Sequence, residues 1–234
     1  MPKSTMSTTL NYSPNFDVKK RKVKELKFII FHYTGMKKEN QAITRLTNTK
    51  SKVSSHYLIK NNGEILTLVP DLYVAWHAGV SSWKNYKSIN KYSIGIEISN
   101  PGHEYSYKKF SKKQIKSILK LSTYLRKKYK IKSNFILGHS DIAPDRKKDP
   151  GERFPWKYLS KNKIGHWHNL NEKKLFKKRN QIVDKLEKNI FIKNLYKLGY
   201  PKNILFNKYK YSKLLITAFQ RRFRQELVNG IIDQ

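Results

Sequence analysis

The chain from residue 26 to residue 160 alternates short apolar runs with one long amphipathic segment. Short runs that are rich in β-branched and aromatic side chains are typical of strands. Two of these runs are separated by Asn61, Asn62 and Gly63, which tolerate the positive φ of a tight turn, so they predict a hairpin. The predicted strands are residues 26–33, 53–60, 64–70, 93–99 and 134–137.

Helical periodicity is clearest in residues 111–130, where apolar side chains recur every three or four positions. Ser111 and Gln114 have the spacing of a capping box at the start of this helix. Residues 38–48 fit a shorter helix. Strands that alternate with helices predict an α/β domain in which helices flank a central mixed β-sheet.

The segments on either side of this domain have different patterns. Residues 1–24 are polar, basic and aperiodic, which predicts an N-terminal arm before a domain that spans residues 25–160. Residues 161–171 are polar and predict a linker. Residues 172–234 predict a small all-helical C-terminal domain. Its two helical patterns are residues 172–198 and 211–227.

The charge of the chain is strongly positive, with 50 Lys and Arg residues against 16 Asp and Glu residues and a net charge of +34. Nucleic acid, anionic lipid and anionic cell-wall polymer all suit such a charge. The basic residues are spread along the chain, however, and no zinc finger, RNA-recognition signature or basic zipper is present. A specific nucleic-acid partner is therefore not expected.

The chain contains no cysteine, which excludes disulfides, thiolate ligands, a cysteine nucleophile and a lipid-modified cysteine. Any metal site must then be made of His and carboxylates. No apolar run reaches the roughly 18 residues of a membrane span, and residues 1–25 lack the apolar run of a signal peptide. We expect a monomer in the cytoplasm, with the periplasm or cell wall as the alternative.

The histidines and carboxylates fall at informative places. His32 ends the first predicted strand, His139 ends the last one, and Asp149 lies in the loop after it. If the two strands are neighbours, both imidazoles emerge at one edge and the loop can return Asp149 to them. Two His and one carboxylate leave a fourth tetrahedral position open, which is typical of catalytic zinc. Glu97 lies within an apolar strand, where an ionised carboxylate is costly unless it is paired or faces a cation.

Five segments, FIIFHYTG, VSSHYLIKNNGEI, AWHAGVS, YSIGIEISN and GHSDIAPDRKKDPG, occur in the order found in the zinc N-acetylmuramoyl-L-alanine amidases of the AmpD and AmiD type. The chain resembles this family over residues 26–160. The resemblance implies hydrolysis of the amide bond between muramic acid and L-alanine in peptidoglycan or its fragments. It further implies that Zn²⁺ is held by His32, His139 and Asp149, that Glu97 is the general base, and that Lys147 stabilises the charge of the tetrahedral intermediate.

Other residues near these motifs have more than one interpretation. His56 and His77 are either alternative metal ligands or, as we expect, residues that support the ligands or contact substrate. Tyr33, Trp76 and Trp83 could stack on sugar or pack on the peptide. The remaining histidines, His103, His166 and His168, match no ligand position of the family and are expected at the surface or in the linker.

The segments FIKNLYKLGYP and ITAFQRRFRQELVNGIIDQ resemble a small three-helix peptidoglycan-binding domain. The Lys- and Tyr-rich NKYKYSK between them, and Asn229 before Gly230, depart from that pattern. Such a domain would tether the enzyme to its polymer. The alternative to an amidase is a non-catalytic peptidoglycan receptor on the same fold, and the presence of all three implied ligands and of Glu97 favours catalysis.

Overall fold

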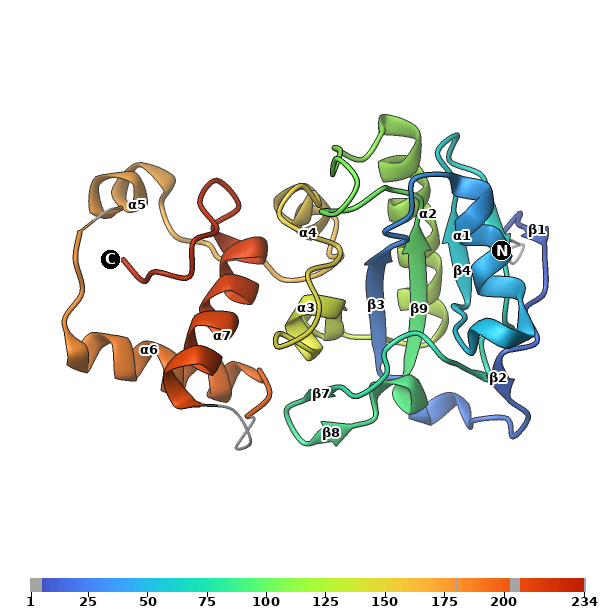
Figure 1. The fold of residues 1–234 in the computed structure, drawn as a ribbon, viewed down its shortest axis with the longest axis horizontal. Coiled ribbons are helices and arrows are strands. Elements are labelled where there is room, and N and C mark those ends of the chain that lie inside the picture. Colours follow the sequence, from blue (N-terminus) through green and yellow to red (C-terminus); the bar gives the residue numbers. More distant parts are fainter. Residues whose placement is uncertain (1–5, 180, 203–206, 234) are drawn as a thin grey trace.

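The computed structural model describes residues 6–179, 181–202 and 207–233. A six-stranded mixed sheet in the order β1-β5-β4-β9-β3-β10 forms its centre (Figure 1). The strands β10, β3, β9 and β4 run parallel to one another, β5 is antiparallel to β4, and β1 is parallel to β5. The strands are β1 (Thr9–Leu10), β3 (Phe28–Tyr33), β4 (Tyr57–Ile59), β5 (Ile65–Thr67), β9 (Ser93–Ile98) and β10 (Ile136–Gly138). The predicted α/β fold with a central mixed sheet is confirmed, as is the hairpin.

The described part of the N-terminal segment is not the free arm that its composition predicted. β1 extends the sheet by pairing with β5, and β2 (Phe16–Asp17) pairs antiparallel with β6 (Val74–Ala75). Arg21 is buried in the domain. Its guanidinium donates hydrogen bonds to the backbone carbonyl groups of Asp71, Tyr73, Asn90 and Ser93, which offset the cost of burying the charge. Backbone pairing over two residues leaves no side-chain periodicity, so the sequence pattern gave no sign of it.

The predicted helices are present, with differences in their bounds. The capping box of Ser111 and Gln114 opens α2 as expected. The expected helix over residues 172–198 is split in two, because Ile182 forms an isolated bridge with Asp233 and Asp184 caps a new helix. None of the described helices is long and apolar enough to cross a membrane. The helices are α1 (Glu39–Thr47), α2 (Lys112–Lys128), α3 (His139–Ile142), α4 (Trp156–Lys161), α5 (Glu172–Lys178), α6 (Lys185–Leu198) and α7 (Lys208–Phe223).

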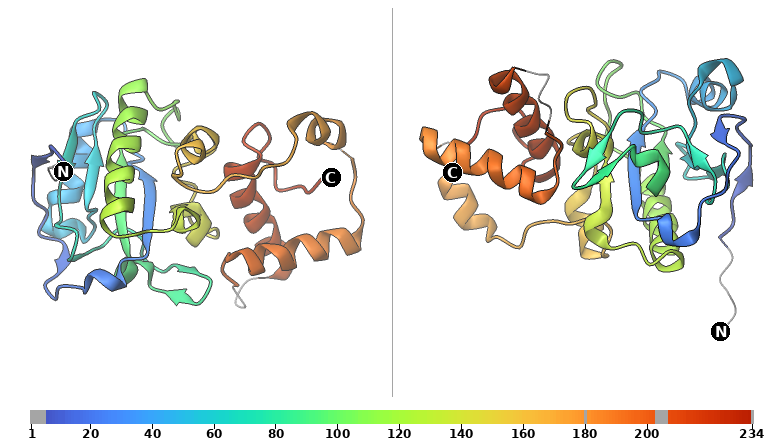
Figure 2. Two further views of the ribbon diagram at one scale, coloured as in Figure 1. Left: turned by 180° about the vertical axis from the view of Figure 1, so that it is seen from behind. Right: turned by 90° about the horizontal axis from the view of Figure 1, so that it is seen from below.

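The two faces of β3 are covered by different parts of the chain. Ile29 and Phe31 point to the face on which α2 and α4 pack. Phe28 and Ile30 point to the opposite face, where they share an apolar cluster with side chains of α6 and α7. The C-terminal helices therefore lie against α3 and the β10 side of the sheet (Figures 1 and 2). The hairpin of β7 (Ser82–Trp83) and β8 (Tyr86–Lys87) joins this contact, because Trp83 packs edge-on against Tyr200.

Candidate metal centre

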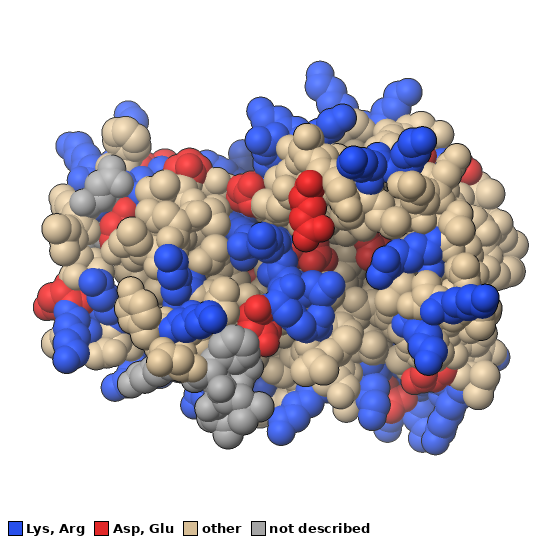
Figure 3. All heavy atoms as spheres, viewed as in Figure 1, with Lys and Arg blue, Asp and Glu red and all other residues tan. Residues whose placement is uncertain are grey.

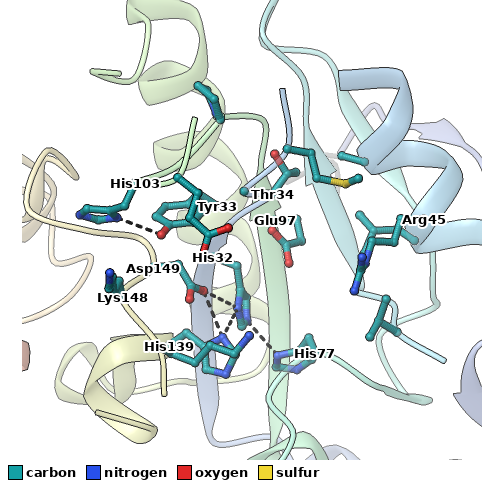
Figure 4. A pocket seen from close by; sticks show the side chains of 18 of the residues that line it. His32, Tyr33, Thr34, Arg45, His77, Glu97, His103, His139, Lys148 and Asp149 are labelled. Atoms are coloured by element: carbon teal, nitrogen blue, oxygen red, sulfur yellow. Dashed lines mark hydrogen bonds and ion pairs between the residues drawn. The ribbon is translucent and has the colours of Figure 1, made fainter. Parts of the chain in front are cut away.

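The parallel pairing of β3 and β9 places two of the predicted site residues side by side. His32 is directly opposite Glu97, and Glu97 is opposite Leu58 on β4. Residues paired in this way project from the same face of a sheet. His32 and Glu97 therefore both face the pocket at the carboxyl ends of these strands (Figure 4).

His139 and Asp149 reach His32 from the segment that follows β10. β10 is the other neighbour of β3, and His139 begins α3 directly after it, rather than ending the strand as expected. The His32 and His139 Nδ1 atoms are 2.9 Å apart, and Asp149 Oδ2 is 3.0 Å from the first and 3.1 Å from the second. All three residues are buried. The sequence prediction that three distant residues converge is thus met by the structure.

This donor set fits a metal ion. Zinc–nitrogen bonds of 2.0–2.1 Å place the ligands of a tetrahedral site about 3.3 Å apart, close to the three observed separations. A hydrogen bond would explain the approach of the two imidazoles only if one Nδ1 carried a proton. Within the described residues, this trio is the one group of His and carboxylate atoms close enough to share an ion.

The second nitrogen of each imidazole has a hydrogen-bond partner, which assigns the tautomers. His139 Nε2 donates to the carbonyl oxygen of Ala78, 3.1 Å away. His32 Nε2 is 3.0 Å from His77 Nδ1, and His77 Nε2 is 3.1 Å from the Ser93 hydroxyl, which donates to the carbonyl oxygen of Ile89. These acceptors favour the tautomer of each ligand that carries its proton on Nε2, which leaves both Nδ1 atoms with a lone pair next to Asp149 Oδ2. This arrangement is the one that metal-binding histidines require.

Burial and charge set the protonation of the centre. Burial, reinforced by His139, lowers the pKa of His32 to about 4, although Asp149 acts against this shift. Burial would raise the pKa of Asp149, but the two imidazoles hold it far below its usual range. Burial and the charge of Asp149 raise the pKa of Glu97 well above its usual range, against the effect of Lys147 and Arg45. A cation at the centre would favour the ionised form of Glu97.

A pocket of about 420 Å³ opens over the three residues, and much of its wall is charged. Lys147 and Lys148 line it from the loop that carries Asp149, and Arg45 lines it from α1 on the opposite side (Figure 4). Glu97 Oε2 is buried and has no hydrogen-bond partner among the described residues. Lys and Arg side chains are spread over the face of the molecule seen in Figure 3.

The other predicted site residues are divided between the pocket and the core. Tyr33 and Trp76 line the pocket, whereas Trp83 is buried under the C-terminal helices. His77 lies behind His32 and contacts the pocket only in part, since it is 9% exposed. His56 is fully buried outside the pocket lining; its Nδ1 accepts a hydrogen bond from the Gly95 amide, and its Nε2 donates one to the carbonyl oxygen of Tyr73. The structure thus places His56 in the core and outside the pocket lining.

His103 was expected to be a surface residue, yet it lines the pocket and is only partly exposed. Its Nδ1 is 2.9 Å from the Tyr33 hydroxyl, and its Nε2 is 3.0 Å from a carboxylate oxygen of Glu152. Arg45 was also missed. Neither residue lies in a motif, and only the packing of separate segments, α1 for Arg45 and a loop for His103, brings them to the site. His166 and His168 lie in the stretch that follows α4, as expected for a linker.

Comparison with known proteins gives consistent matches. A family model described as N-acetylmuramoyl-L-alanine amidase matches residues 22–152, more than half of the chain. The N-acetylmuramoyl-L-alanine amidase AmiD of Escherichia coli is 32% identical over 220 residues, which cover 89% of this chain and 78% of that protein. The 1,6-anhydro-N-acetylmuramyl-L-alanine amidase AmpD of Haemophilus influenzae is 40% identical over 111 residues, or 47% of this chain and 58% of that protein.

Solved structures extend the likeness beyond the segment that the family model matches. Escherichia coli AmiD in complex with anhydro-N-acetylmuramic acid-L-Ala-D-gamma-Glu-L-Lys superposes with a TM-score of 0.78 at 32% identity, covering 89% of this chain and 84% of that one. AmpDh3 from Pseudomonas aeruginosa, in complex with anhydromuramic pentapeptide, gives a TM-score of 0.76 at 27% identity, covering 100% of this chain and 92% of that one. The likeness therefore includes the C-terminal helices.

Proposed function

The chain belongs to the N-acetylmuramoyl-L-alanine amidase family, and from this premise we propose that it is a zinc-dependent amidase. It hydrolyses the amide bond between the muramic acid lactyl group and L-alanine in peptidoglycan or its fragments. The observation that supports the proposal most is the convergence of His32, His139 and Asp149 below a pocket, with Glu97 in the next strand on the same face.

His32, His139 and Asp149 would hold the metal through two Nδ1 atoms and one carboxylate oxygen. When bound there, Zn²⁺ supplies Lewis acidity and makes water nucleophilic at neutral pH. Three protein ligands would leave the metal a further position for water or substrate, as a catalytic zinc site requires. Hydrogen bonds to Ala78 and His77 keep both imidazoles in the tautomer that presents Nδ1.

Glu97 is the general base in this proposal. Its Oε2 atom is buried without a partner, so it can accept a proton from the attacking water without first breaking a protein hydrogen bond. The same carboxyl group can then return the proton to the leaving amine of L-alanine. Water adds to the carbonyl carbon, and the C–N bond breaks. The products are the lactyl carboxylate and the free amine of the stem peptide.

Lys147 stabilises the negative charge that develops on the carbonyl oxygen. It lies in the pocket wall two residues before Asp149, and its charge already acts on both Glu97 and His32. A fixed cation that faces the oxyanion lowers the barrier because its position needs no reorganisation during the reaction. Tyr33 and Trp76, which line the same pocket, contact the substrate.

The C-terminal helices bind the wall polymer in this proposal and so raise the local substrate concentration. The proposal is supported by the likeness of the whole chain to AmiD and AmpDh3, whose matches extend over these helices.

The activity is tested by incubating the purified protein with sacculi and, separately, with anhydromuropeptide, and identifying the products by mass. We expect release of free stem peptide that disappears with a chelator and returns with zinc. A protein that binds either substrate but releases no peptide in the presence of zinc would be a receptor rather than an amidase.

A further inference from the structure

A buried carboxylate next to the metal centre is held by the C-terminal helices. Asp141 lies in α3, two residues after His139, and is 1% exposed. Its Oδ1 accepts a hydrogen bond from the Tyr200 hydroxyl at 2.8 Å, and its Oδ2 accepts one from Arg222 Nη1 at 2.6 Å. Oδ2 also accepts from the Gly138 amide, which caps the start of α3. Two of these three donors come from the far end of the chain.

Arg222 holds both sides of the turn that presents His139. Besides its ion pair with Asp141 in α3, its Nη2 donates to the carbonyl oxygen of Ile136 in β10. Arg222 is 3% exposed, and its guanidinium lies over the Trp156 ring, 4.0 Å from the centroid. A charge buried in this way is stable only with its partner in place. The position of Arg222 is therefore closely determined.

α3 carries more of the centre than His139 alone. The Ser140 amide donates a hydrogen bond to the backbone carbonyl of Asp149 at 2.9 Å, so α3 also holds the loop of the third ligand. A shift of α3 would move two of the three ligands relative to His32. Ligand distances in metal sites tolerate only about 0.2 Å of deviation.

We propose that Arg222 and Tyr200 are positioning residues for the metal centre, which hold His139 and Asp149 in binding geometry through Asp141. The inference rests on the proposed zinc site. It assigns the C-terminal helices a role in the active site that is separate from any contact with the wall polymer. It also explains why these helices share a core with the sheet instead of being joined by a flexible tether.

The test compares zinc affinity with stability in four variants. Arg222→Met removes the cation, Arg222→Lys keeps the charge without the two-sided contact, and Tyr200→Phe removes one hydrogen bond. Leu215→Ala is the matched control, because Leu215 is fully buried in the same contact between α7 and the sheet but does not touch Asp141. Zinc Kd is measured by competition with a chromophoric chelator, and Tm is measured on the metal-free protein.

We expect Arg222→Met to raise the zinc Kd by about tenfold or more, in the range known for residues that orient metal ligands. Tyr200→Phe should raise it less, and Arg222→Lys should recover part of the loss. Leu215→Ala should lower Tm but leave Kd unchanged. If Arg222→Met does not fold, Tyr200→Phe and Arg222→Lys carry the test against the same control.

Three outcomes would overturn the inference, and they distinguish failure of the positioning role from failure of the proposed function. If the parent protein binds zinc and releases stem peptide, but Tyr200→Phe and Arg222→Lys bind zinc as the parent does, the positioning role alone is wrong. The same holds if Leu215→Ala weakens zinc binding as much as they do at an equal loss of Tm. If the parent protein binds no zinc, the proposed function itself fails.

Discussion

Replacement of His77 by Phe tests the tautomer chain behind the metal centre. Nδ1 of His77 accepts a hydrogen bond from Nε2 of His32 at 3.0 Å, and Nε2 of His77 donates one to the Ser93 hydroxyl oxygen at 3.1 Å. A phenyl ring retains most of the shape of this buried side chain. Gly95 leaves room for a ring at this position, because a Cβ on residue 95 would lie only 2.4 Å from the His77 ring. The substitution thus removes mainly the acceptor.

The size of the effect follows from two independent estimates. Loss of the partner that orients a metal-binding histidine costs about 10–100-fold in affinity, which is about 1.4–2.8 kcal/mol. A buried N–H left without an acceptor costs about 1–3 kcal/mol, and His32 is 1% exposed, so water cannot replace His77. The estimates agree, and the zinc Kd of His77→Phe should rise by about one to two orders of magnitude.

Competition with a chromophoric chelator measures this Kd, and His56→Phe is the control. His56 is a buried histidine that also contacts β9, but it does not touch a ligand. Its replacement should lower stability and leave zinc affinity unchanged. Ser93→Ala should weaken zinc binding less than His77→Phe does. It removes the hydroxyl that fixes the tautomer of His77, but it keeps the His77 ring that accepts the hydrogen bond of His32. An unchanged Kd in His77→Phe would refute the reasoning from tautomers.

Three further substitutions and one titration test the rest of the site. Glu97→Gln should keep zinc stoichiometry and lower turnover by about 10²–10⁴-fold; a fully active variant would remove Glu97 from the role of base. His139→Ala should abolish stoichiometric zinc in the purified protein, as measured by metal analysis, and an undiminished zinc content would show that the ligand set is wrong. Lys147→Ala should lower kcat by about 10²–10³-fold, whereas Lys148→Ala, one residue further in the same pocket wall, should have little effect on steady-state rates. Burial lowers the pKa of His56 to about 3, that of His32 to about 4 and that of His77 well below its usual value. These three histidines outnumber Glu97, whose raised pKa acts in the opposite direction, so below about pH 6.5 the unfolded chain binds more protons than the folded, metal-free protein. Its free energy of unfolding in urea should therefore fall as pH is lowered from about 6.5 toward 4; a flat profile would contradict these assignments.

The strands and helices around the site could be predicted because their signals are local. The apolar run that ends in His32 and the alternation around Glu97 each correspond to an observed strand. The resemblance to a known family indicated which histidines converge, because the matching segments include His32 and His139. In contrast, β1 and β2 have two residues each and pair through the backbone alone, so nothing in their side chains distinguishes them from an arm.

His103 shows a second reason why part of the site could not be predicted. It lies in a polar stretch without periodicity, and its partners Tyr33 and Glu152 are 70 and 49 residues away in the sequence. Its place in the pocket depends on how two loops pack against each other. Sequence reasoning assigns such a histidine to the surface, because a polar loop is usually solvated.

The role of Arg222 had a sequence signal that became readable only with the structure. Leu215, Ala218 and Arg222 share one face of α7, at the i, i+3 and i+7 positions of an apolar stripe, and all three are buried. An arginine on such a stripe requires buried hydrogen-bond acceptors, of which a carboxylate is the strongest, and the chain has only 16 Asp and Glu residues to supply one. Asp141, two residues after the implied metal ligand His139, is the carboxylate that pairs with Arg222. The pattern thus indicated that a partner must exist, while the pairing itself depends on how the C-terminal helices pack against α3. Metal affinity in this protein should accordingly depend on a helix that lies outside the segment matched by the family model.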